Sequence, residues 1–411
     1  MGLMFRSTIQ QSFCIIVLIL YICIMIKRVL EDKIRLLADK FPVVSVTGPR
    51  QSGKTTLIRS MFPHYRYESL EDPDTRLFAL NDPRKFLKSE KKMIIDEIQR
   101  VPELFSYIQT ITDTADIAGQ YIISGSQSFL LNQHISQSLA GRVATLNLMP
   151  LSISELRNYR IPVLGYEKFV FQGFYPRLYD KEINPGDFYP NYIQTYIERD
   201  VRLLQNIHEL TLFVRFLKLC AGRIGQLLNL NSLANDCGIS PNTVKSWISV
   251  LEAGYIIFLL QPHYKNFNKR LVKMPKLYFI DTGLASSLLE IRPESQLSTH
   301  YLRGALFENF ILSEFIKKRY NSGLRNNCYF WRDNKGVEID CIIENGKKLT
   351  PVEIKSSNTF NQDFFKHLNY WNKLSDNSGE NSFVIYGGEL NRNMKEGVLL
   401  SWQNIDTIPL M

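Results

Sequence analysis

Residues 48–55 read Gly-Pro-Arg-Gln-Ser-Gly-Lys-Thr, a combination of residue types that can hold phosphate. Gly48 and Gly53 are separated by four residues, and Lys54 and Thr55 follow at once. At this spacing, backbone N–H groups surround a polyphosphate, the lysine neutralises its outer phosphates, and the threonine hydroxyl is available to Mg²⁺. The sequence therefore predicts a binding site for a nucleoside triphosphate.

The segments on either side of this loop support the prediction. The β-branched run at 43–47 predicts a short buried parallel strand, and residues 56–60 contain no helix breaker. The phosphates would then lie at a helix N-terminus, where the backbone dipoles favour negative charge. These flanks disfavour the alternative of a glycine-rich turn that matches by chance. The residues expected to hold ATP are Gly48, Pro49, Arg50, Gln51, Ser52, Gly53, Lys54, Thr55 and Thr56.

A second apolar run, at 93–95, ends in Asp96 and Glu97. Ligands of open α/β sheets bind at the carboxyl ends of the strands, so these carboxylates are placed for chemistry. We expect Asp96 to hold Mg²⁺ through water, with Thr55 as the direct ligand. Glu97 is expected to orient or deprotonate the attacking water. The alternative, a solvated strand end, is less favoured because a complete phosphate loop precedes the pair.

A third apolar run, at 121–126, closes with Ser126, which is expected to sense the γ-phosphate or hold the water; Ser124 is the second choice and a simple turn the alternative. Arg142 follows a helix-ending glycine and is a candidate arginine finger. It could act within its own chain or across a subunit boundary, in which case the protein would be a homo-oligomer. A surface or packing role for Arg142 stays open.

The composition bounds the class of protein. At 411 residues, two or three domains are expected, and a net charge of +9 favours polyanionic partners without naming one. The six cysteines are widely spread and form no C-x-x-C pair, so neither a zinc site nor a disulfide framework is indicated. A reducing, cytoplasmic location fits best.

An apolar run at 13–26 precedes Lys27 and Arg28. It is shorter than the roughly 20 residues that a membrane-spanning helix needs. A short anchor with the body of the protein on the cytoplasmic side is one interpretation. We favour another, in which translation starts at Met25 and the upstream residues reflect a misassigned start codon. Membrane association is then not expected.

The motifs GPRQSGKTT, IIDEIQRVPEL, IISGSQ, LAGRV and LMPLSISEL follow one another in this order. Together they resemble a group of bacterial and archaeal AAA-type ATPases whose C-terminal half is a domain of unknown function. The resemblance covers nearly the whole chain from Met25 onward. It implies a compact P-loop domain with a parallel sheet, and it supplies no biological role.

The middle of the chain begins with an aromatic-rich stretch at 153–205, which predicts a helical connector with a buried aromatic seam. A stacking platform for nucleic-acid bases is the less favoured alternative. A helix-turn-helix pattern follows: a short helix ends at Gly238, and a second helix starts after Ser240. Apolar runs at 255–260 and 276–280 complete a predicted winged helix.

This winged helix predicts contact with DNA. The second helix would place Asn242, Thr243, Lys245 and Ser246 in a major groove, and the basic loop at 265–276 would contact phosphates. The alternative is a protein-docking module with a solvated basic loop.

The last third of the chain carries a group of acids. Strands are predicted at 336–343 and 351–355, joined through an Asn-Gly turn. Cross-strand partners then have an odd sum of residue numbers, which puts Glu338 and Asp340 on one face with Glu353 and Lys355. A predicted helix at 304–319 places Glu308 where it can join them.

Converging acids are costly unless a cation lies between them. Asp340 and Glu353, with Glu308, are expected to bind Mg²⁺, and Lys355 to position a water or stabilise the phosphate. The pattern D-x12-E-x-K resembles the PD-(D/E)xK nuclease superfamily, which includes archaeal resolvases and restriction enzymes. It departs from that pattern in having Ile339 before Asp340 where proline is expected. A charged face of an edge hairpin is the alternative.

The sequence thus predicts an α/β protein: a P-loop AAA-type ATPase domain, then a winged helix, then a nuclease-like α/β domain. The expected limits are 1–26 for the apolar leader, 27–152 for the ATPase, 153–205 for the connector, 206–292 for the winged helix and 293–411 for the last domain. The predicted function is Mg²⁺-dependent ATP hydrolysis in a DNA-associated protein with a nuclease-like domain. The alternative is a nucleotide-switched signalling or scaffold ATPase whose C-terminal domains bind protein partners.

Overall fold

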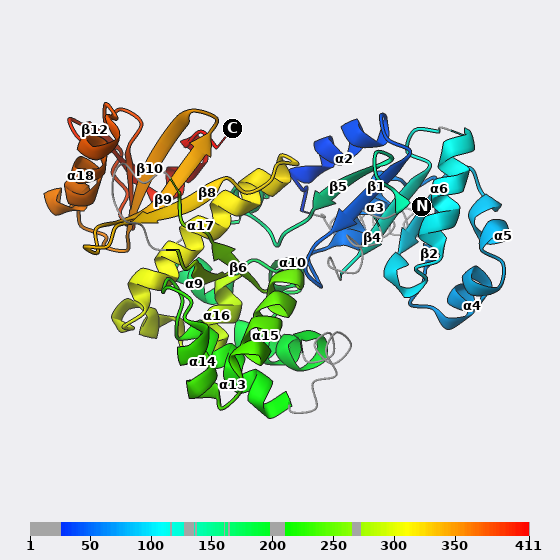
Figure 1. Cartoon of the computed structure of the whole chain (residues 1–411), viewed down its shortest axis with the longest axis horizontal. Helices are drawn as coiled ribbons and strands as arrows, with labels where there is room; N and C mark the ends of the chain where they lie inside the picture. The colour runs from blue at the N-terminus through cyan, green and yellow to red at the C-terminus, as the bar shows by residue number, and fades with distance from the viewer. Residues whose placement is uncertain are drawn as a thin grey trace, which may run out of the picture.

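The computed structural model describes residues 26–115, 117–126, 135, 138–159, 161–162, 165–197, 210–264 and 273–410. Its elements form three regions (Figure 1). An N-terminal region with a five-stranded sheet lies on one side, a C-terminal region with a six-stranded sheet on the other, and a mainly helical region between them. The apolar run at 13–25 is outside the described residues.

The N-terminal sheet is parallel throughout, in the order β2-β3-β4-β1-β5. Its strands are β1 (Val43–Thr47), β2 (Arg66–Ser69), β3 (Met93–Asp96), β4 (Tyr121–Gly125) and β5 (Val143–Asn147). The predicted runs at 43–47, 93–95 and 121–126 are therefore confirmed as strands. Because β4 lies between β1 and β3, the end of β4 faces both the phosphate loop and the Asp-Glu pair.

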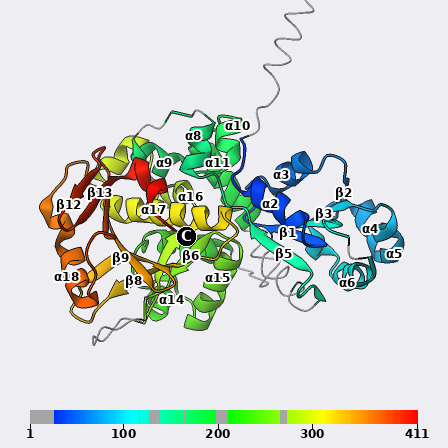
Figure 2. The ribbon, with the colours of Figure 1, turned by 90° about the horizontal axis from the view of Figure 1, so that it is seen from above.

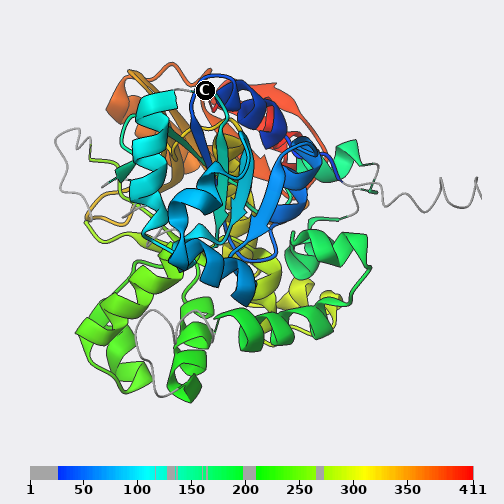
Figure 3. The same cartoon turned by 90° about the vertical axis from the view of Figure 1, so that its right-hand side faces the viewer.

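Helices cover both faces of this sheet, as its continuous apolar strands require. Alternate strand residues point to opposite faces: Val44 and Val46 pack with α2 (Leu30–Ala38) and α3 (Lys54–Met61). Val43, Ile95 and Ile123 pack with the other group of helices. That group is α4 (Pro73–Asn81), α5 (Pro83–Lys88) and α6 (Leu104–Ala115). Figure 3 shows the strands seen from this region's side, with the middle helices below them.

The middle region begins with short helices and continues as the predicted helix-turn-helix. The short helices are α8 (Ile153–Asn158), α9 (Tyr166–Gln172), α10 (Pro176–Asp180) and α11 (Pro185–Tyr192), with a π-helix at Ile193–Ile197. Phe169, Phe174 and Tyr175 are buried in the core, so the aromatic-seam interpretation is confirmed over the stacking platform. After α13 (Leu210–Ala221) come α14 (Leu230–Cys237) and α15 (Pro241–Ala253).

Capping residues fix the turn between α14 and α15. Gly238 ends α14 with φ +79°, a conformation that glycine adopts without strain, and the Ser240 side chain accepts from the N–H of Thr243 at the start of α15. An antiparallel hairpin follows, made of β6 (Ile257–Leu260) and β7 (Lys276–Phe279). The first strand starts later than predicted because Tyr255 turns the chain with φ +55°. Then comes α16 (Thr282–Leu288).

The C-terminal region is a mixed sheet in the order β12-β13-β11-β10-β9-β8. The strands are β8 (Cys328–Arg332), β9 (Glu338–Asn345), β10 (Lys348–Lys355), β11 (Phe383–Tyr386), β12 (Arg392–Met394) and β13 (Gly397–Ser401). The helix α18 (Lys366–Ser375) packs against β9 and β10. In the β9–β10 hairpin, Lys348 pairs with Asn345 and Val352 with Cys341, so the predicted odd-sum register is confirmed.

One long helix, α17 (Arg303–Asn321), joins the three regions. It contacts β10 of the C-terminal sheet, α9 and α16 of the middle region, and α2 and β5 of the N-terminal region. Figure 2 shows it running between the two outer regions. A single hydrophobic core extends from the middle helices through α17 to β9 and β10. The predicted helix at 304–319 is confirmed.

Candidate functional site

The phosphate loop connects β1 to α3, and its glycines are required by geometry. Gly48 has φ +146°, and a Cβ atom there would lie 2.1 Å from the backbone oxygen of Leu148. Gly53, at the N-cap of α3, has φ +91°, and Gln51 between them has φ +59°. Residues other than glycine rarely adopt such positive φ angles, so the shape of the loop depends on Gly48 and Gly53.

Lys54 starts α3 and is only 6% exposed. Its Nζ donates to the backbone oxygens of Gly48 at 2.9 Å and Pro49 at 2.8 Å, which holds the ammonium over the loop. Ser52 is fully buried, and its hydroxyl has no hydrogen-bond partner. A buried unpartnered hydroxyl beside an ammonium and a helix N-terminus is a donor set that fits a phosphate.

Thr55 lies one residue further along α3 and meets the end of β3. Its Oγ1 donates to Oδ2 of Asp96 at 2.7 Å. The same carboxylate accepts from Tyr67 Oη at 3.0 Å, from Ser124 Oγ and from the N–H of Glu97 at 3.2 Å. Burial and the charge of Asp96 raise the pKa of Tyr67 to about 12, which keeps this hydroxyl a donor. Asp96 is thus fixed by four donors, and its oxygens and that of Thr55 are ligands of the kind that Mg²⁺ prefers.

Glu97 follows β3 with a left-handed backbone, φ +54° and ψ +44°. This conformation costs a non-glycine residue on the order of 1 kcal/mol, and such costs concentrate at functional sites. Its Oε2 accepts from Ser126 Oγ at 3.3 Å and from the Gln99 amide. The structure therefore brings Glu97 and Ser126 together, as the two strand-end predictions require.

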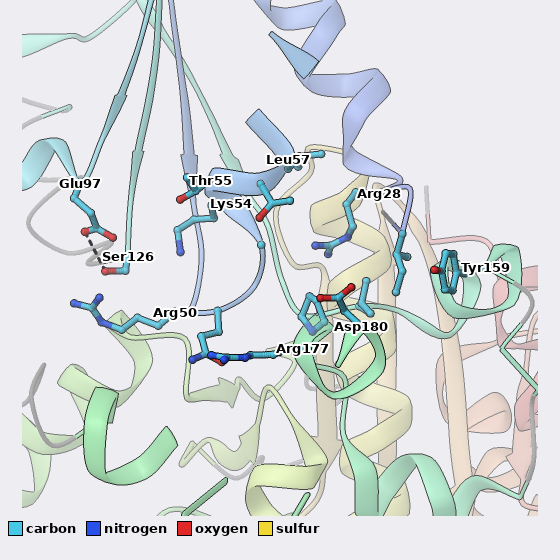
Figure 4. Close-up of a pocket in the computed structure, with 16 residues that line it drawn as sticks. Arg28, Arg50, Lys54, Thr55, Leu57, Glu97, Ser126, Tyr159, Arg177 and Asp180 are labelled. Carbon is cyan, nitrogen blue, oxygen red and sulfur yellow. Dashed lines mark hydrogen bonds between the residues drawn. The ribbon is translucent and has the colours of Figure 1, made fainter. Parts of the chain in front are cut away.

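A cavity of about 620 Å³ lies over the loop. Figure 4 shows Glu97 and Ser126 at one end, Lys54 and Thr55 in the middle, and Arg28 and Tyr159 at the other end. Its predicted lining residues are Arg50, Gln51, Gly53, Lys54, Thr55, Thr56, Glu97 and Ser126. The lining residues not predicted for this site are Ile26, Arg28, Leu57, Leu151, Tyr159, Pro176, Arg177 and Asp180.

Arg28 shows why sequence reasoning missed such residues. Its guanidinium is 5% exposed and pairs with Glu155 at 3.0 Å, while donating to the backbone oxygens of Ser52 at 2.8 Å and Met149 at 2.6 Å. The partners lie 127 residues apart along the chain, so no local motif indicates the contact. Arg28 therefore supports the phosphate loop from behind, in a hydrogen-bonded ion pair.

The structure does not bring Arg142 to this cavity. Its backbone oxygen accepts from Val43 at the start of β1, which is the edge of the sheet opposite the phosphate loop. Its side chain forms an ion pair with Asp113 and donates to the backbone oxygen of Ala140 at 3.0 Å. An arginine finger within the same chain is therefore not possible for Arg142 in this arrangement, because the length of β1 separates it from the loop. A role across a subunit boundary stays a prediction.

A second polar cluster gathers the residues predicted for the C-terminal sheet. Lys355 Nζ lies 3.4 Å from Asp340 Oδ2 and also bonds Glu353. Burial would raise the pKa of Asp340, but Lys355 and Lys276 outweigh it and hold that pKa below the usual carboxyl range. Burial and the neighbouring Asp340 charge raise the pKa of Glu353 well above that range.

Lys276 was predicted as the last cation of the basic loop that would contact DNA phosphates, but the structure buries it in this cluster of acids. It comes from β7 of the middle region, is 3% exposed, and bonds Glu308 at 3.2 Å and Glu338. Despite burial, the charges of Glu308 and Glu338 raise its pKa above the ordinary lysine value. Burial raises the pKa of Glu308 to about 7, with Lys276 opposing the shift. The sequence places Lys276 on a different hairpin, 62 residues before Glu338, so only the fold reveals the pair.

In the structure, the acids predicted to bind Mg²⁺ are paired with lysines. Among the residues that the structure describes, no group of three or more His, Cys, Asp or Glu side chains is arranged to hold a metal ion. Two ammonium groups, those of Lys276 and Lys355, lie among the acids. Lys355 is the lysine that the sequence analysis placed at this site, and Lys276 adds a second positive charge; the metal roles of Glu308, Asp340 and Glu353 stay a prediction.

The surface predicted to contact DNA is partly described. On α15, Asn242 and Lys245 are exposed, whereas Thr243 and Ser246 are half-buried, and Thr243 is engaged in the helix cap. Residues 265–272 of the basic loop lie outside the described residues. In the described ranges, no helix is both long enough and apolar enough to cross a membrane.

Three family models match the chain. Residues 40–157 match an AAA domain, residues 164–295 a domain of unknown function (DUF8612), and residues 303–405 another domain of unknown function (DUF4143). The AAA match contains the phosphate loop and both β3 carboxylates. The chain therefore contains an AAA-type P-loop ATPase domain and a C-terminal domain of unknown function.

The similar proteins include several without an assigned role. An uncharacterized protein of Mycobacterium tuberculosis is 29% identical over 344 residues, which cover 82% of this chain and 76% of the relative. An uncharacterized protein of Methanocaldococcus jannaschii is 25% identical over 303 residues, 61% of this chain and 63% of the relative. Among solved structures, a Walker-type ATPase of Pyrococcus abyssi is 13% identical, with a TM-score of 0.39, over 64% of this chain and 95% of that one. AMPPCP-bound DnaA from Aquifex aeolicus is 16% identical, with a TM-score of 0.28, over 55% of this chain and 86% of that one.

Proposed function

We propose that this protein binds ATP with Mg²⁺ in the cavity over the phosphate loop and hydrolyses it. One observation carries the proposal: β3 and β4 end side by side, so that Asp96 reaches Thr55 while Glu97 reaches Ser126. Magnesium coordination and water activation then lie at opposite sides of one site. A phosphate-binding turn alone would not need either contact.

The residues divide the chemistry between them. Lys54 and the loop N–H groups bind the β- and γ-phosphates, and Glu97 accepts the proton of the attacking water. As the water oxygen bonds to the γ-phosphorus, the bond from that phosphorus to the β–γ bridging oxygen breaks, which releases ADP and phosphate. Ser126 fixes the Glu97 carboxylate. Mg²⁺, held by Thr55 directly and by Asp96 through water, would neutralise charge on the phosphates.

The test compares Lys54→Ala with the wild-type chain. Titration with a fluorescent ATP analogue should show at least about 100-fold weaker binding in the variant, because the ammonium over the loop is lost. Release of phosphate should fall to background. Lys40→Ala, which removes an exposed lysine after α2, is the matched control and should change neither reading. Equal binding by Lys54→Ala and wild type would contradict the proposal.

We further propose that the protein associates with DNA through α15. The support is the capped helix-turn-helix, the hairpin behind it, and the exposed Asn242 and Lys245 on its second helix. A helix presented in this way fits a major groove, and a lysine on it would contact phosphate or base edges. Cleavage of DNA by the C-terminal domain is not part of this proposal, because Lys276 pairs with Glu308 and Glu338 of its acidic cluster.

Fluorescence anisotropy with labelled duplex DNA separates this proposal from the protein-docking alternative. Lys245→Ala should weaken binding by roughly 3- to 10-fold and reduce the slope of log K against log salt by about one. Lys218→Ala, which removes an exposed lysine from α13 in the same region, is the control. Undetectable DNA binding in a chain that still turns over ATP would favour the signalling or scaffold alternative.

A further inference from the structure

The middle region forms one wall of the ATP cavity in the same chain. The helix α10 starts at Pro176, whose Cγ lies 3.9 Å from the position that a Cβ atom on Gly53 would take. Tyr192, at the end of α11, donates to the backbone oxygen of Arg50 at 3.5 Å. The N-terminal end of α10 therefore lies against the phosphate loop, with no second subunit needed to close this side.

A second contact fixes the middle region against the same sheet edge. The Tyr255 hydroxyl lies 3.0 Å from Thr47 Oγ1, at the end of β1, and 2.9 Å from Asn147 Oδ1, at the end of β5. Thr47 ends the strand that leads into the phosphate loop, and Asn147 ends the strand paired beside it. The two contacts together hold α10 at a defined position over the carboxyl edge of the sheet.

Arg177 is the cation that this wall contributes. It is the second residue of α10, its side chain is exposed, and it lines the cavity. Figure 4 places it with Arg50 across from Lys54. Of the other cavity cations, Arg28 is held by Glu155 and two backbone oxygens, and Lys54 and Arg50 belong to the loop itself. Among the described residues that line the cavity, Arg177 is therefore the arginine that comes from the middle region.

We propose that Arg177 binds the terminal phosphate of ATP within its own chain, as the arginine that stabilises charge during hydrolysis. Its planar guanidinium can donate two parallel hydrogen bonds to phosphate oxygens. Because α10 belongs to the middle region, loss of the γ-phosphate removes a bond between that region and the ATPase domain. The inference rests on the proposed ATP hydrolysis, and it gives the role within one chain to Arg177 instead of Arg142.

The test measures turnover and nucleotide affinity in Arg177→Ala, with Arg84→Ala, which removes an exposed arginine of α5 that does not line the cavity, as the matched control. Arg177→Ala should lower kcat by at least about 100-fold, in line with the effect of removing such an arginine. It should weaken ATP binding while leaving ADP binding within about 2-fold, because ADP lacks the contacted phosphate. Arg177→Lys should restore ATP affinity better than kcat, since lysine keeps the charge and loses the paired donors.

Three results would overturn this assignment. These are wild-type kcat in Arg177→Ala, an equal loss of ATP and ADP affinity, and a turnover per chain that falls when the wild-type protein is diluted about 100-fold, since that would require an arginine from a second chain. Circular dichroism of the Arg177 variants checks their folding, and Arg177→Gln replaces Arg177→Ala if the latter is unstable. If the wild type binds ATP but never hydrolyses it, the proposed function fails, and the ATP-to-ADP affinity ratio still tests Arg177.

Discussion

Thr55 Oγ1 and Asp96 Oδ2 lie 2.7 Å apart and join the first turn of α3 to the end of β3. These are the two protein oxygens from which a Mg²⁺ site beside a triphosphate would be built. Tyr67, Ser124 and the Glu97 N–H also donate to this carboxylate and hold it in place. The site is therefore preorganised, and binding of Mg²⁺ and nucleotide requires little free energy to orient Asp96.

Replacing Thr55 by valine keeps the shape of the side chain and removes its hydroxyl. We expect ATP turnover to fall at least about 100-fold and the Mg²⁺ dependence of nucleotide affinity to disappear, because the direct ligand is lost. Thr55→Ser is the control and should retain most activity. Phosphate release at several Mg²⁺ concentrations measures both effects. An active valine variant with normal Mg²⁺ dependence would remove Thr55 from its assigned role.

Replacing Gly48 by alanine should destabilise the ATPase domain. The new Cβ would meet the Leu148 backbone oxygen at 2.1 Å, and backbone cannot move away cheaply. A loss of more than about 2 kcal/mol is expected, measured by thermal or urea denaturation. Gly141→Ala is the matched control: its φ is +80°, but nothing lies within 4 Å of the added atom. Equal losses would show that left-handed strain, not the clash, dominates at Gly48.

The pairing of Lys276 with Glu308 and Glu338 predicts how the protein responds to metal. Because Lys276 lies among the acids, wild-type protein should gain no thermal stability from Mn²⁺ through Asp340, and it should not cut plasmid DNA in Mg²⁺. Lys276→Met removes the charge at similar volume and should create Mn²⁺-dependent stabilisation that disappears when Asp340→Asn is added. If Mn²⁺ stabilises the wild-type protein and Asp340→Asn abolishes that stabilisation, the wild-type cluster binds metal through Asp340 and this prediction is contradicted.

The same cluster predicts a pH dependence of stability. Burial raises the pKa of Glu308 to about 7, from an ordinary value of 4.5. The folded chain then binds this proton more tightly than the unfolded chain, so the free energy of unfolding falls as the pH rises from about 4.5 to about 7. Glu308→Gln should remove on the order of 2–3 kcal/mol of that fall. Denaturation midpoints across this range measure it, and parallel profiles for variant and wild type would contradict it.

Local pattern was sufficient where the site is built from adjacent residues. The loop from Gly48 to Thr55 and the Asp-Glu pair at the end of β3 could be predicted directly from the sequence. Because side chains of a strand alternate between its two faces, Asp340 and Glu353 could also be placed on one face. Contacts between segments that are distant in the sequence could not be predicted from local pattern. Lys276 reaches Glu338 from another hairpin, and Arg177 lines the cavity from α10, because tertiary packing sets those positions.

Arg142 shows how local pattern also suggested a contact that the fold does not make within one chain. It follows a glycine near the end of the ATPase motifs, which made it a candidate for phosphate contact. The deciding fact is strand direction: β5 runs parallel to β1, so a residue at the start of β5 lies at the edge away from the loop. Sequence order fixed neither the strand neighbours nor which edge Arg142 would occupy.

The most direct test of ATP hydrolysis at this site is single-turnover phosphate release by Glu97→Gln and wild-type protein, with ATP affinity measured in parallel. Glutamine keeps the size and accepts from Ser126, but it cannot take the proton of water. The account predicts ATP affinity within about 3-fold of wild type and phosphate release at least about 100-fold slower. Unchanged phosphate release in Glu97→Gln would contradict it.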